Sequence, residues 1–142
     1  MGLFVILSPM IKAVVFDYGG VILKNLHWYQ EMFDLARDLR AKGYKTAILS
    51  NMIAPLAWIA HHMPTTRDFS PVVISADVGH SKPRPEIYYI LLDQIGLEPK
   101  ECLFIDDRSE NIATAEALGF ETMHVEDPIE TVKKIRDLLD IK

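Results

Sequence analysis

The chain has 142 residues, of which 49% are hydrophobic and 25% are charged. This length favours one domain over residues 1–142, and the composition is that of an ordinary globular protein. Twenty acidic and fifteen basic residues give a net charge of −5, which argues against a general affinity for nucleic acid or an anionic membrane. The sequence also has no run of the ~20 apolar residues needed to span a bilayer.

The first nine residues and the single cysteine bear on targeting and compartment. Residues 1–9 are apolar but lack the basic start and small-residue cleavage site of a signal peptide. They have three interpretations: an extra edge strand, a disordered lead, or sequence upstream of a start at Met10, with the last two favoured. Cys102 lies in a strand-like run, and we expect a small buried hydrophobe in a reducing compartment, the cytoplasm.

Short apolar segments alternate with amphipathic ones along the whole chain. The predicted elements are a strand over 12–16, a helix over 28–42, a strand over 45–49, a helix over 55–62, a strand over 72–74, a polar loop over 77–85, a helix over 86–95, a strand over 102–105, a helix over 109–118, a strand over 121–125 and a helix from Pro128. This alternation predicts an α/β protein, a Rossmann-like doubly wound parallel sheet between two layers of helices.

Helical periodicity also predicts which side chains are buried. In the helix over 28–42 the apolar positions are Met32, Phe33, Leu35, Ala36 and Leu39. In the terminal helix they are Ile129, Val132, Ile135, Leu138 and Leu139, which we expect to form one apolar stripe. Ser109 is a suitable N-cap for the helix that it begins.

Asp17 is the most informative residue, because it ends a buried apolar strand and is followed at once by Tyr18-Gly19-Gly20. Such a carboxylate lies at the carboxyl edge of the sheet, where open α/β folds place their chemistry. It can attack phosphorus as a nucleophile, and it can also bind Mg²⁺. The glycines let the backbone turn sharply, so that a main-chain carbonyl can face the same metal.

Three further segments carry polar residues at the ends of apolar segments. Ser50 and Asn51 follow the strand over 45–49 and offer a hydroxyl and N–H groups to a phosphate oxygen. Lys82 lies in a loop that Pro83 and Pro85 restrict, where its ammonium can neutralise both the nucleophile and a phosphoryl group. His80 and Arg84 of this loop are expected at the rim of the site, without a role in the chemistry.

The fourth segment is the acidic pair Asp106-Asp107, which follows the strand over 102–105. Adjacent carboxylates need a counter-ion, and a hard divalent cation with oxygen ligands supplies one. Asn111 can orient the pair from the start of the next helix. The aromatic run from His27 to Tyr29 either lines the mouth of the site or packs, and packing is favoured.

Each of these features also has an ordinary structural interpretation. Asp17 can be an acidic strand end beside a turn, and Ser50-Asn51 can be simple turn chemistry. Lys82 can be a solvated surface lysine, and the acidic pair can be a helix N-terminus enriched in acid. Only their combination, in this order, points to one site.

Taken in order, the segments at 14–22, 48–51, 81–88 and 104–111 resemble the four motifs of the haloacid dehalogenase superfamily. The resemblance covers nearly all of residues 10–126. It implies a Rossmann-like core and Mg²⁺-dependent phosphatase chemistry through an aspartyl-phosphate. The nucleophile would be Asp17, the phosphate-holding hydroxyl Ser50 and the electrostatic lysine Lys82. The metal ligands would be Asp17, the Gly19 carbonyl and Asp107, with Asp106 in support.

Two departures from the family pattern matter. Most phosphatases of the family carry a second aspartate two positions after the nucleophile, as the acid and base, but here that position is Gly19. Losing positioned acid–base help costs ~10²–10⁴ in rate. Related members also usually insert a helical cap between the first two motifs, and the segment from Asp17 to Ser50 is too short for one. An open site of this kind suits a macromolecular substrate, a second subunit as cover, or reduced activity.

We therefore predict a cap-less Mg²⁺-dependent phosphatase that acts on a phosphorylated small molecule or macromolecule. The alternative is a catalytically weak or inactive module of the same fold, serving as a binding or assembly subunit. Phosphotransferase or dehalogenase chemistry is less favoured. The intact Asp17, Lys82 and Asp107 favour the enzyme, whereas Gly19 and the missing cap favour the binding module.

Overall fold

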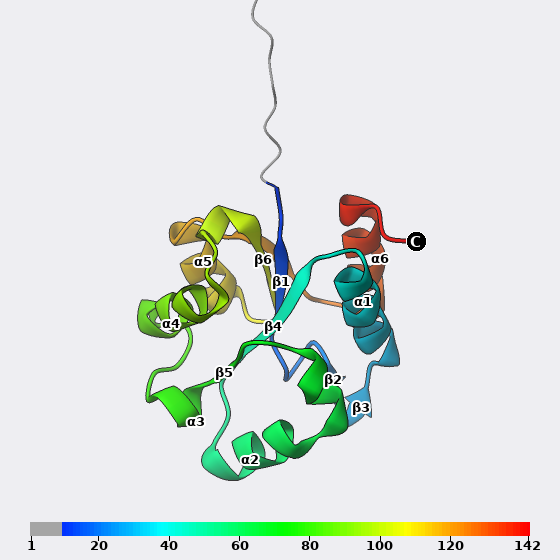
Figure 1. The fold of residues 1–142 in the computed structure, drawn as a ribbon. Coiled ribbons are helices and arrows are strands. Elements are labelled where there is room, and N and C mark those ends of the chain that lie inside the picture. The colour runs from blue at the N-terminus through cyan, green and yellow to red at the C-terminus, as the bar shows by residue number, and fades with distance from the viewer. Residues whose placement is uncertain (1–9) are drawn as a thin grey trace, which may run out of the picture.

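A five-stranded parallel sheet forms the centre of the computed structural model, which describes residues 10–142 (Figure 1). Its strands are β1 (Ala13–Phe16), β4 (Lys45–Ser50), β5 (Val72–Ile74), β6 (Cys102–Asp106) and β7 (Glu121–His124). Their order across the sheet is β5-β4-β1-β6-β7. The predictions for residues 1–9 lie outside the described residues.

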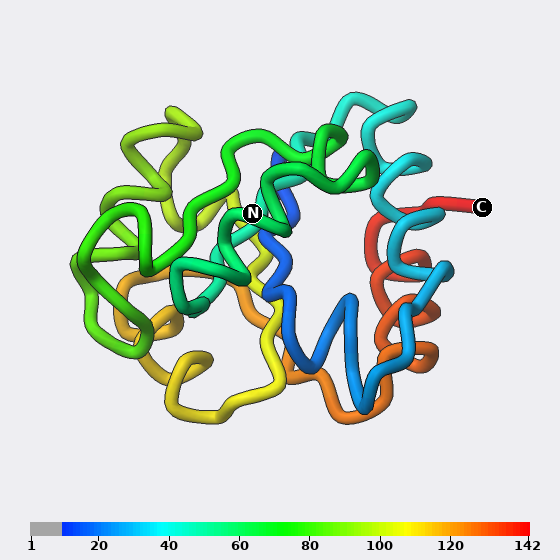
Figure 2. The backbone as a smooth tube through the Cα atoms, turned by 90° about the horizontal axis from the view of Figure 1, so that it is seen from below, coloured from blue at the N-terminus to red at the C-terminus, as the bar shows by residue number. Residues whose placement is uncertain are grey.

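Helices cover both faces of this sheet. The described helices are α1 (Gln30–Ala41), α2 (Ala54–His62), α3 (Ser75–Val78), α4 (Pro85–Ile95), α5 (Ser109–Ala117) and α6 (Pro128–Leu139), with short 3-10 turns η1 (Pro64–Asp68) and η2 (Pro99–Glu101). Helices α1 and α6 lie on one face and α4 and α5 on the other (Figures 1 and 2). The predicted three-layer α/β architecture is confirmed. Within residues 10–142, no helix combines the length and apolar character required to cross a membrane.

The central strand β1 is buried along its whole length because it has a helical layer on each side. Its side chains alternate between the two layers. Val14 and Phe16 join the apolar cluster beneath α1 and α6, whereas Ala13 and Val15 join the cluster beneath α4 and α5. A run of four apolar residues is therefore what this strand requires. Cys102, in the neighbouring β6, is also buried, as predicted.

The register of the sheet decides which residues meet at its carboxyl edge. Phe16 of β1 is level with Ile48 of β4 and with Ile105 of β6. Asp17, the next residue along the chain, donates its backbone N–H to the Ile105 carbonyl at 3.1 Å. Asp17 and Asp106 therefore lie side by side at the carboxyl edge of the sheet. This edge faces downward in Figure 1, toward α2 and a hairpin formed by residues 23–28.

That hairpin was not predicted. Strands β2 (Leu23–Lys24) and β3 (His27–Trp28) pair antiparallel, and Asn25 and Leu26 form the turn with φ of 51° and 62°. The predicted start of the first helix at Trp28 is therefore wrong, since α1 begins at Gln30. Two residues join the strands, so no cap domain is inserted there, as the short segment from Asp17 to Ser50 had indicated.

Other corrections concern the ends and faces of helices. Arg108, not Ser109, precedes the first turn of α5 as its N-cap, and α3 occupies part of what was predicted as a polar loop. The predicted stripe on α6 is partly wrong: Ile129 is 41% and Leu138 60% exposed. Helix α6 instead buries one face at helical spacing, formed by Pro128, Thr131, Val132 and Ile135. Phe33 of α1 is only partly buried.

Candidate active site

Four segments of the chain meet at the carboxyl edge of the sheet, and each brings one of the predicted polar residues. Asp17 follows β1, Ser50 ends β4, and Asp106 ends β6. Lys82 comes from the loop between α3 and α4. All four side chains are buried. Asp17, Ser50 and Lys82 line a cavity of about 290 Å³, whereas Asp106 is not part of its wall. The cavity is also lined by Gly19, Asn51, Asp107, Arg108 and Asn111.

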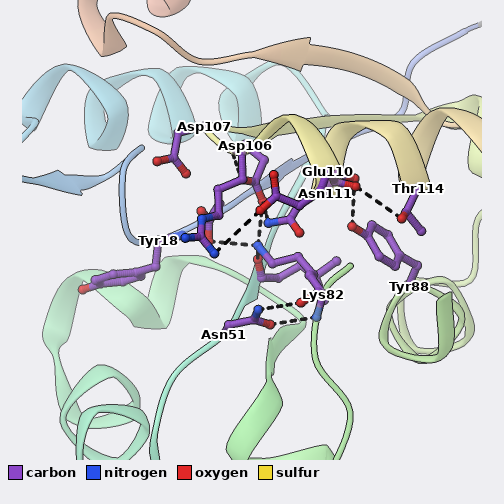
Figure 3. A network of polar contacts seen from close by, with 12 residues as sticks. Tyr18, Asn51, Lys82, Tyr88, Asp106, Asp107, Glu110, Asn111 and Thr114 are labelled. Carbon is purple, nitrogen blue, oxygen red and sulfur yellow. Dashed lines mark hydrogen bonds and ion pairs between the residues drawn. The ribbon is translucent and has the colours of Figure 1, made fainter. Parts of the chain in front are cut away.

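The ammonium of Lys82 is the centre of this arrangement (Figure 3). Its Nζ lies 3.0 Å from Asp17 Oδ1, 2.7 Å from Asp106 Oδ2 and 2.8 Å from the Leu49 carbonyl oxygen. An ammonium has three protons to donate, and these contacts use all of them. The Lys82 side chain is 1% exposed, so the surface interpretation of this lysine does not hold.

Asn51 holds the main chain of Lys82 in place. Its Nδ2 donates to the Lys82 carbonyl at 2.9 Å, and its Oδ1 accepts from the Lys82 N–H at 2.9 Å (Figure 3). This role was not predicted, since Asn51 was assigned to phosphate binding. The two residues are 31 positions apart, and no sequence pattern joins them.

The Asp106 carboxylate accepts three hydrogen bonds within the protein. Besides Lys82, its carboxylate accepts from the Arg108 backbone N–H at 2.9 Å and from Asn111 Nδ2 at 3.1 Å. Asn111 thus contacts the acidic pair from the first turn of α5. Its own carbonyl accepts from the hydroxyl of Tyr88 in α4 at 2.8 Å, so α4 also supports this carboxylate. Tyr88 was not singled out, because a tyrosine in an amphipathic helix carries no mark of such a contact.

Asp107 is held differently, and it lies beside Asp106 with no dashed contact to Lys82 in Figure 3. Its main-chain carbonyl lies 2.7 Å from His124 Nε2, which anchors the backbone. Its carboxylate lies against Gly20, which has φ of 85°, and a Cβ at that position would overlap it. Within residues 10–142 Asp107 makes no ion pair, whereas Asp17 and Asp106 both contact Lys82.

The charges in this site do not balance. Burial, and next the negative charge of Asp106, raise the pKa of Asp17 to about 7, although Lys82 opposes that shift. Burial and the same carboxylate also raise the pKa of Asp107. Three carboxylates share one ammonium, so the fully ionised site carries an excess of negative charge.

These residues fit a divalent metal ion. Asp17, Asp106 and Asp107 can each offer an oxygen, and the three oxygens lie within 4.8 Å of one another. Carboxylate oxygens are the donors that Mg²⁺ prefers, and a cation would relieve the excess charge. Because the Asp106 carboxylate already accepts three hydrogen bonds, from Lys82, Arg108 and Asn111, the carboxylates of Asp17 and Asp107 are the better placed for a cation.

Of the remaining residues near the site, some line the cavity and others lie outside its wall. Gly19 lines the cavity, and a Cβ built on it would have no atom within 4 Å. Arg108, which was not singled out, also lines the cavity, although its side chain is 67% exposed. His80 and Arg84 are exposed and are absent from the cavity wall, as expected for rim residues.

Comparison with known proteins agrees with this geometry. A family model described as haloacid dehalogenase-like hydrolase matches residues 28–119. "Acyl-CoA dehydrogenase family member 10" of Mus musculus is 37% identical over 72% of this chain, and the "sesquiterpene phosphatase" astK of Aspergillus oryzae is 32% identical over 76% of it. The aligned parts make up 10% and 56% of those two proteins, so much of each has no counterpart in this match.

Solved structures share the fold. A predicted HAD-like family hydrolase from Porphyromonas gingivalis superposes with a TM-score of 0.80 at 22% identity, over 94% of this chain and 100% of that one. A HAD family enzyme from Bacteroides thetaiotaomicron, in complex with magnesium and inorganic phosphate, has a TM-score of 0.70 at 21% identity, over 82% of this chain and 96% of that one. Since the family model covers more than half of the sequence and the folds agree, the chain belongs to the haloacid dehalogenase-like hydrolases.

Proposed function

We propose that the protein is a Mg²⁺-dependent phosphomonoester hydrolase that acts through an aspartyl-phosphate on Asp17. The observation that carries this proposal is the contact of one buried ammonium, Lys82, with both Asp17 and Asp106, beside the carboxylate of Asp107. The phosphatase among its relatives and the magnesium and phosphate in a structural neighbour support the same chemistry.

The side chains divide the reaction between them. An oxygen of the Asp17 carboxylate forms a bond to phosphorus while the bond from phosphorus to the ester oxygen breaks. Water then attacks the phosphorus of the aspartyl-phosphate, which releases inorganic phosphate and the Asp17 carboxylate. Lys82 fixes the position of Asp17 and offsets negative charge at the nucleophile. Ser50 and the backbone near it would hold the phosphate oxygens.

Mg²⁺ would be held by Asp17 and Asp107, with Asp106 in support and the Gly19 carbonyl as a further ligand. When bound, it supplies positive charge that offsets the repulsion between the carboxylates and the anionic substrate. The raised pKa of Asp17 fits this role, because a cation beside the carboxylate favours its ionised, nucleophilic form.

Gly19 sets a limit on the chemistry. It has no side chain with which to protonate the departing oxygen, so that proton must come from solvent. Esters whose leaving group is stable as an anion should therefore react much faster than alkyl esters. We expect acyl and aryl phosphates to be hydrolysed well and simple alkyl phosphates poorly.

The experiment compares hydrolysis of acetyl phosphate, 4-nitrophenyl phosphate and ethyl phosphate in Mg²⁺, with and without a chelator. Asp17→Asn should abolish turnover. The matched control is Asp93→Asn, an exposed aspartate of α4 outside the site, which should leave turnover unchanged. Full activity of Asp17→Asn would overturn the mechanism, and equal rates on all three substrates would show that another group supplies the proton.

The second candidate is a binding or assembly module, favoured by the absence of an acid at Gly19. Thermal melting with Mg²⁺ and beryllium fluoride, which mimics a phosphoryl group on aspartate, distinguishes this candidate function from the enzyme. A rise in melting temperature that Asp17→Asn abolishes supports the phosphatase. Absence of both the rise and any hydrolysis would favour the module, with the open site covered by a second copy of the chain or another partner.

A further inference from the structure

We infer that the substrate carries an apolar group, and that about eight carbon atoms of this group bind in a second pocket beside the carboxylates. This inference rests on the proposed function, because it names the ester group of the phosphate that the site would cleave. The pocket has a volume of about 240 Å³ and shares three wall residues with the cavity of the active site: Gly19, Ser50 and Asn51.

The other walls of this pocket are apolar or aromatic. Tyr18, Leu23 and Trp28 form one side, and Met52, Leu56, Ile59, Ala60 and Met63 form the other. The Tyr18 and Trp28 rings meet edge to face, with centroids 5.8 Å apart. The Tyr18 hydroxyl lies 3.4 Å from Met63 Sδ, which joins the two sides. Figure 3 shows the Tyr18 ring directed away from the carboxylates.

The two cavities therefore differ sharply in chemistry although they adjoin. The first is lined by Asp17, Lys82 and Asp107, and suits a phosphoryl group with a cation. The wall of the second is mostly apolar, and among residues 10–142 no lysine, arginine, aspartate or glutamate lines it. A ligand that fills both must carry an anionic head and an apolar body.

Gly19 is part of the wall of both cavities. A Cβ at this position would have no neighbour within 4 Å, so the absence of a side chain leaves space there. The residue that deprives the site of an acid thus also leaves room for the ester group of the substrate.

Exposure in α2 supports the same conclusion. Leu56 is 52% and Ile59 50% exposed, although each lines the pocket. Large apolar side chains gathered around a concave surface are typical of ligand sites. The pocket volume corresponds to about eight groups of the size of a water molecule, at ~30 Å³ each. That number sets the expected length of the bound chain.

The experiment measures binding of n-alkylphosphonates, from ethyl to decyl, by titration calorimetry in Mg²⁺. These compounds are not hydrolysed, so the missing acid does not affect the result. We expect affinity to rise about twofold to fourfold with each methylene, up to about eight carbons, and then to level off as the pocket fills.

Two substitutions locate the effect. Leu56→Gln and Ile59→Gln should each reduce the affinity for octylphosphonate by about tenfold while leaving that for ethylphosphonate unchanged, because only the long chain reaches these residues. The matched control is Leu138→Gln, an equally exposed leucine on α6 at 60%, which should change neither affinity.

The outcomes separate this inference from the proposed function. Affinity that does not depend on chain length, in a protein that hydrolyses acetyl phosphate, would overturn the apolar subsite and leave the phosphatase intact. A chain-length dependence that both α2 variants retain would overturn the assignment to this pocket. Length-dependent binding without hydrolysis of any ester would support the pocket and contradict the enzyme.

Discussion

Glycine at position 19 leaves an empty space two residues beyond the proposed nucleophile. No φ in the left-handed region is required there, and a Cβ would touch nothing within 4 Å. An aspartate can therefore be introduced without strain. Because Gly19 lines the active-site cavity, we expect the carboxyl group of an aspartate there to reach the departing oxygen of a bound ester.

We predict that Gly19→Asp raises kcat for ethyl phosphate by roughly 10²-fold, the value of positioned acid–base help. The effect on acetyl phosphate should be small, because acetate leaves without a proton. Gly19→Asn, which has the same shape but no acid, is the control and should give no gain. Steady-state kinetics on the two substrates test this, and equal gains from both variants would show that proton transfer is not the cause.

Gly20, unlike Gly19, has no room for a side chain. Its φ is 85°, and a Cβ would overlap the carboxylate of Asp107. We predict that Gly20→Ala weakens Mg²⁺ binding about tenfold, equivalent to ~1.4 kcal/mol, because the methyl group displaces a metal ligand. Titration calorimetry measures the affinity.

The control for that substitution is Gly43→Ala. Gly43 has φ of 95°, so the same backbone strain arises, but a Cβ there would have nothing within 4 Å. It should lower the melting temperature without changing the affinity for Mg²⁺. Equal affinity of both variants and the unsubstituted protein would show that Asp107 moves freely or is not a ligand.

Among the elements, the loop that carries Lys82 has no regular structure of its own at that point, yet it places a buried ammonium. It is fixed to the end of β4 by the two hydrogen bonds between Asn51 and the Lys82 main chain. The side chain of Lys82 then reaches Asp17 on β1 and Asp106 on β6. One amide thus ties three strand ends together through a single loop.

We predict that Asn51→Ala lowers kcat/KM for acetyl phosphate by about tenfold and the free energy of unfolding by about 1–3 kcal/mol, the net value of two ordinary hydrogen bonds. Gln94→Ala removes an exposed amide of α4 outside the site and is the control. Kinetics and denaturant unfolding should be measured on both. A loss of stability without a loss of activity would show that Lys82 keeps its place without Asn51.

The elements also show what a sequence pattern can and cannot predict. The strands of the parallel sheet were predicted to within a residue or two. In β1, β5 and β6 the signal is the nearly unbroken apolar run that a buried parallel strand needs. The β2–β3 hairpin was missed, because two-residue strands are too short for any periodicity. The α6 stripe was partly wrong, because Ile129 and Leu138 have the right character but lie off the face that Thr131 and Ile135 turn toward the sheet.

Over the whole molecule, the polar site could be anticipated because every predicted residue follows or flanks an apolar segment, and parallel strands bring their carboxyl ends together. What could not be anticipated depends on pairs distant in the chain. Asn51 with Lys82 and Tyr88 with Asn111 are such pairs. The apolar pocket is another case, since Trp28 and Ile59 are brought together only by the fold.

The stability of the protein should depend on pH, because the fold brings ionisable side chains together in this site. In the metal-free protein the pKa of Asp17 is raised to about 7, from 3.8, mainly by burial. A raised pKa means that the folded state holds its proton more tightly than the unfolded state. The contribution to stability is therefore complete below about pH 4 and is lost as the pH rises through about 7. The raised pKa of Asp107 acts in the same direction.

Two other carboxylates have shifted pKa values, but they do not change the stability in this pH range. The pKa of Asp38 is lowered, chiefly by Arg136, and that of Glu101 chiefly by Lys12. A lowered pKa stabilises the folded state above its unfolded value and is lost only in more acidic solution. Between about pH 5 and pH 8 both contributions are constant, so the site carboxylates dominate the slope.

We therefore predict that the free energy of unfolding of the metal-free protein falls by roughly 2 kcal/mol between about pH 5 and pH 8. Asp17→Asn should remove most of that decrease, because an amide does not titrate, and Asp93→Asn should leave it intact. Mg²⁺ should restore stability at pH 8 far more than at pH 5, since it binds the ionised carboxylates that the empty site disfavours. Urea unfolding at each pH, with a chelator or with Mg²⁺, measures these differences. A flat profile for the unsubstituted protein would mean that Asp17 stays ionised without a metal, with Lys82 and solvent alone stabilising its charge.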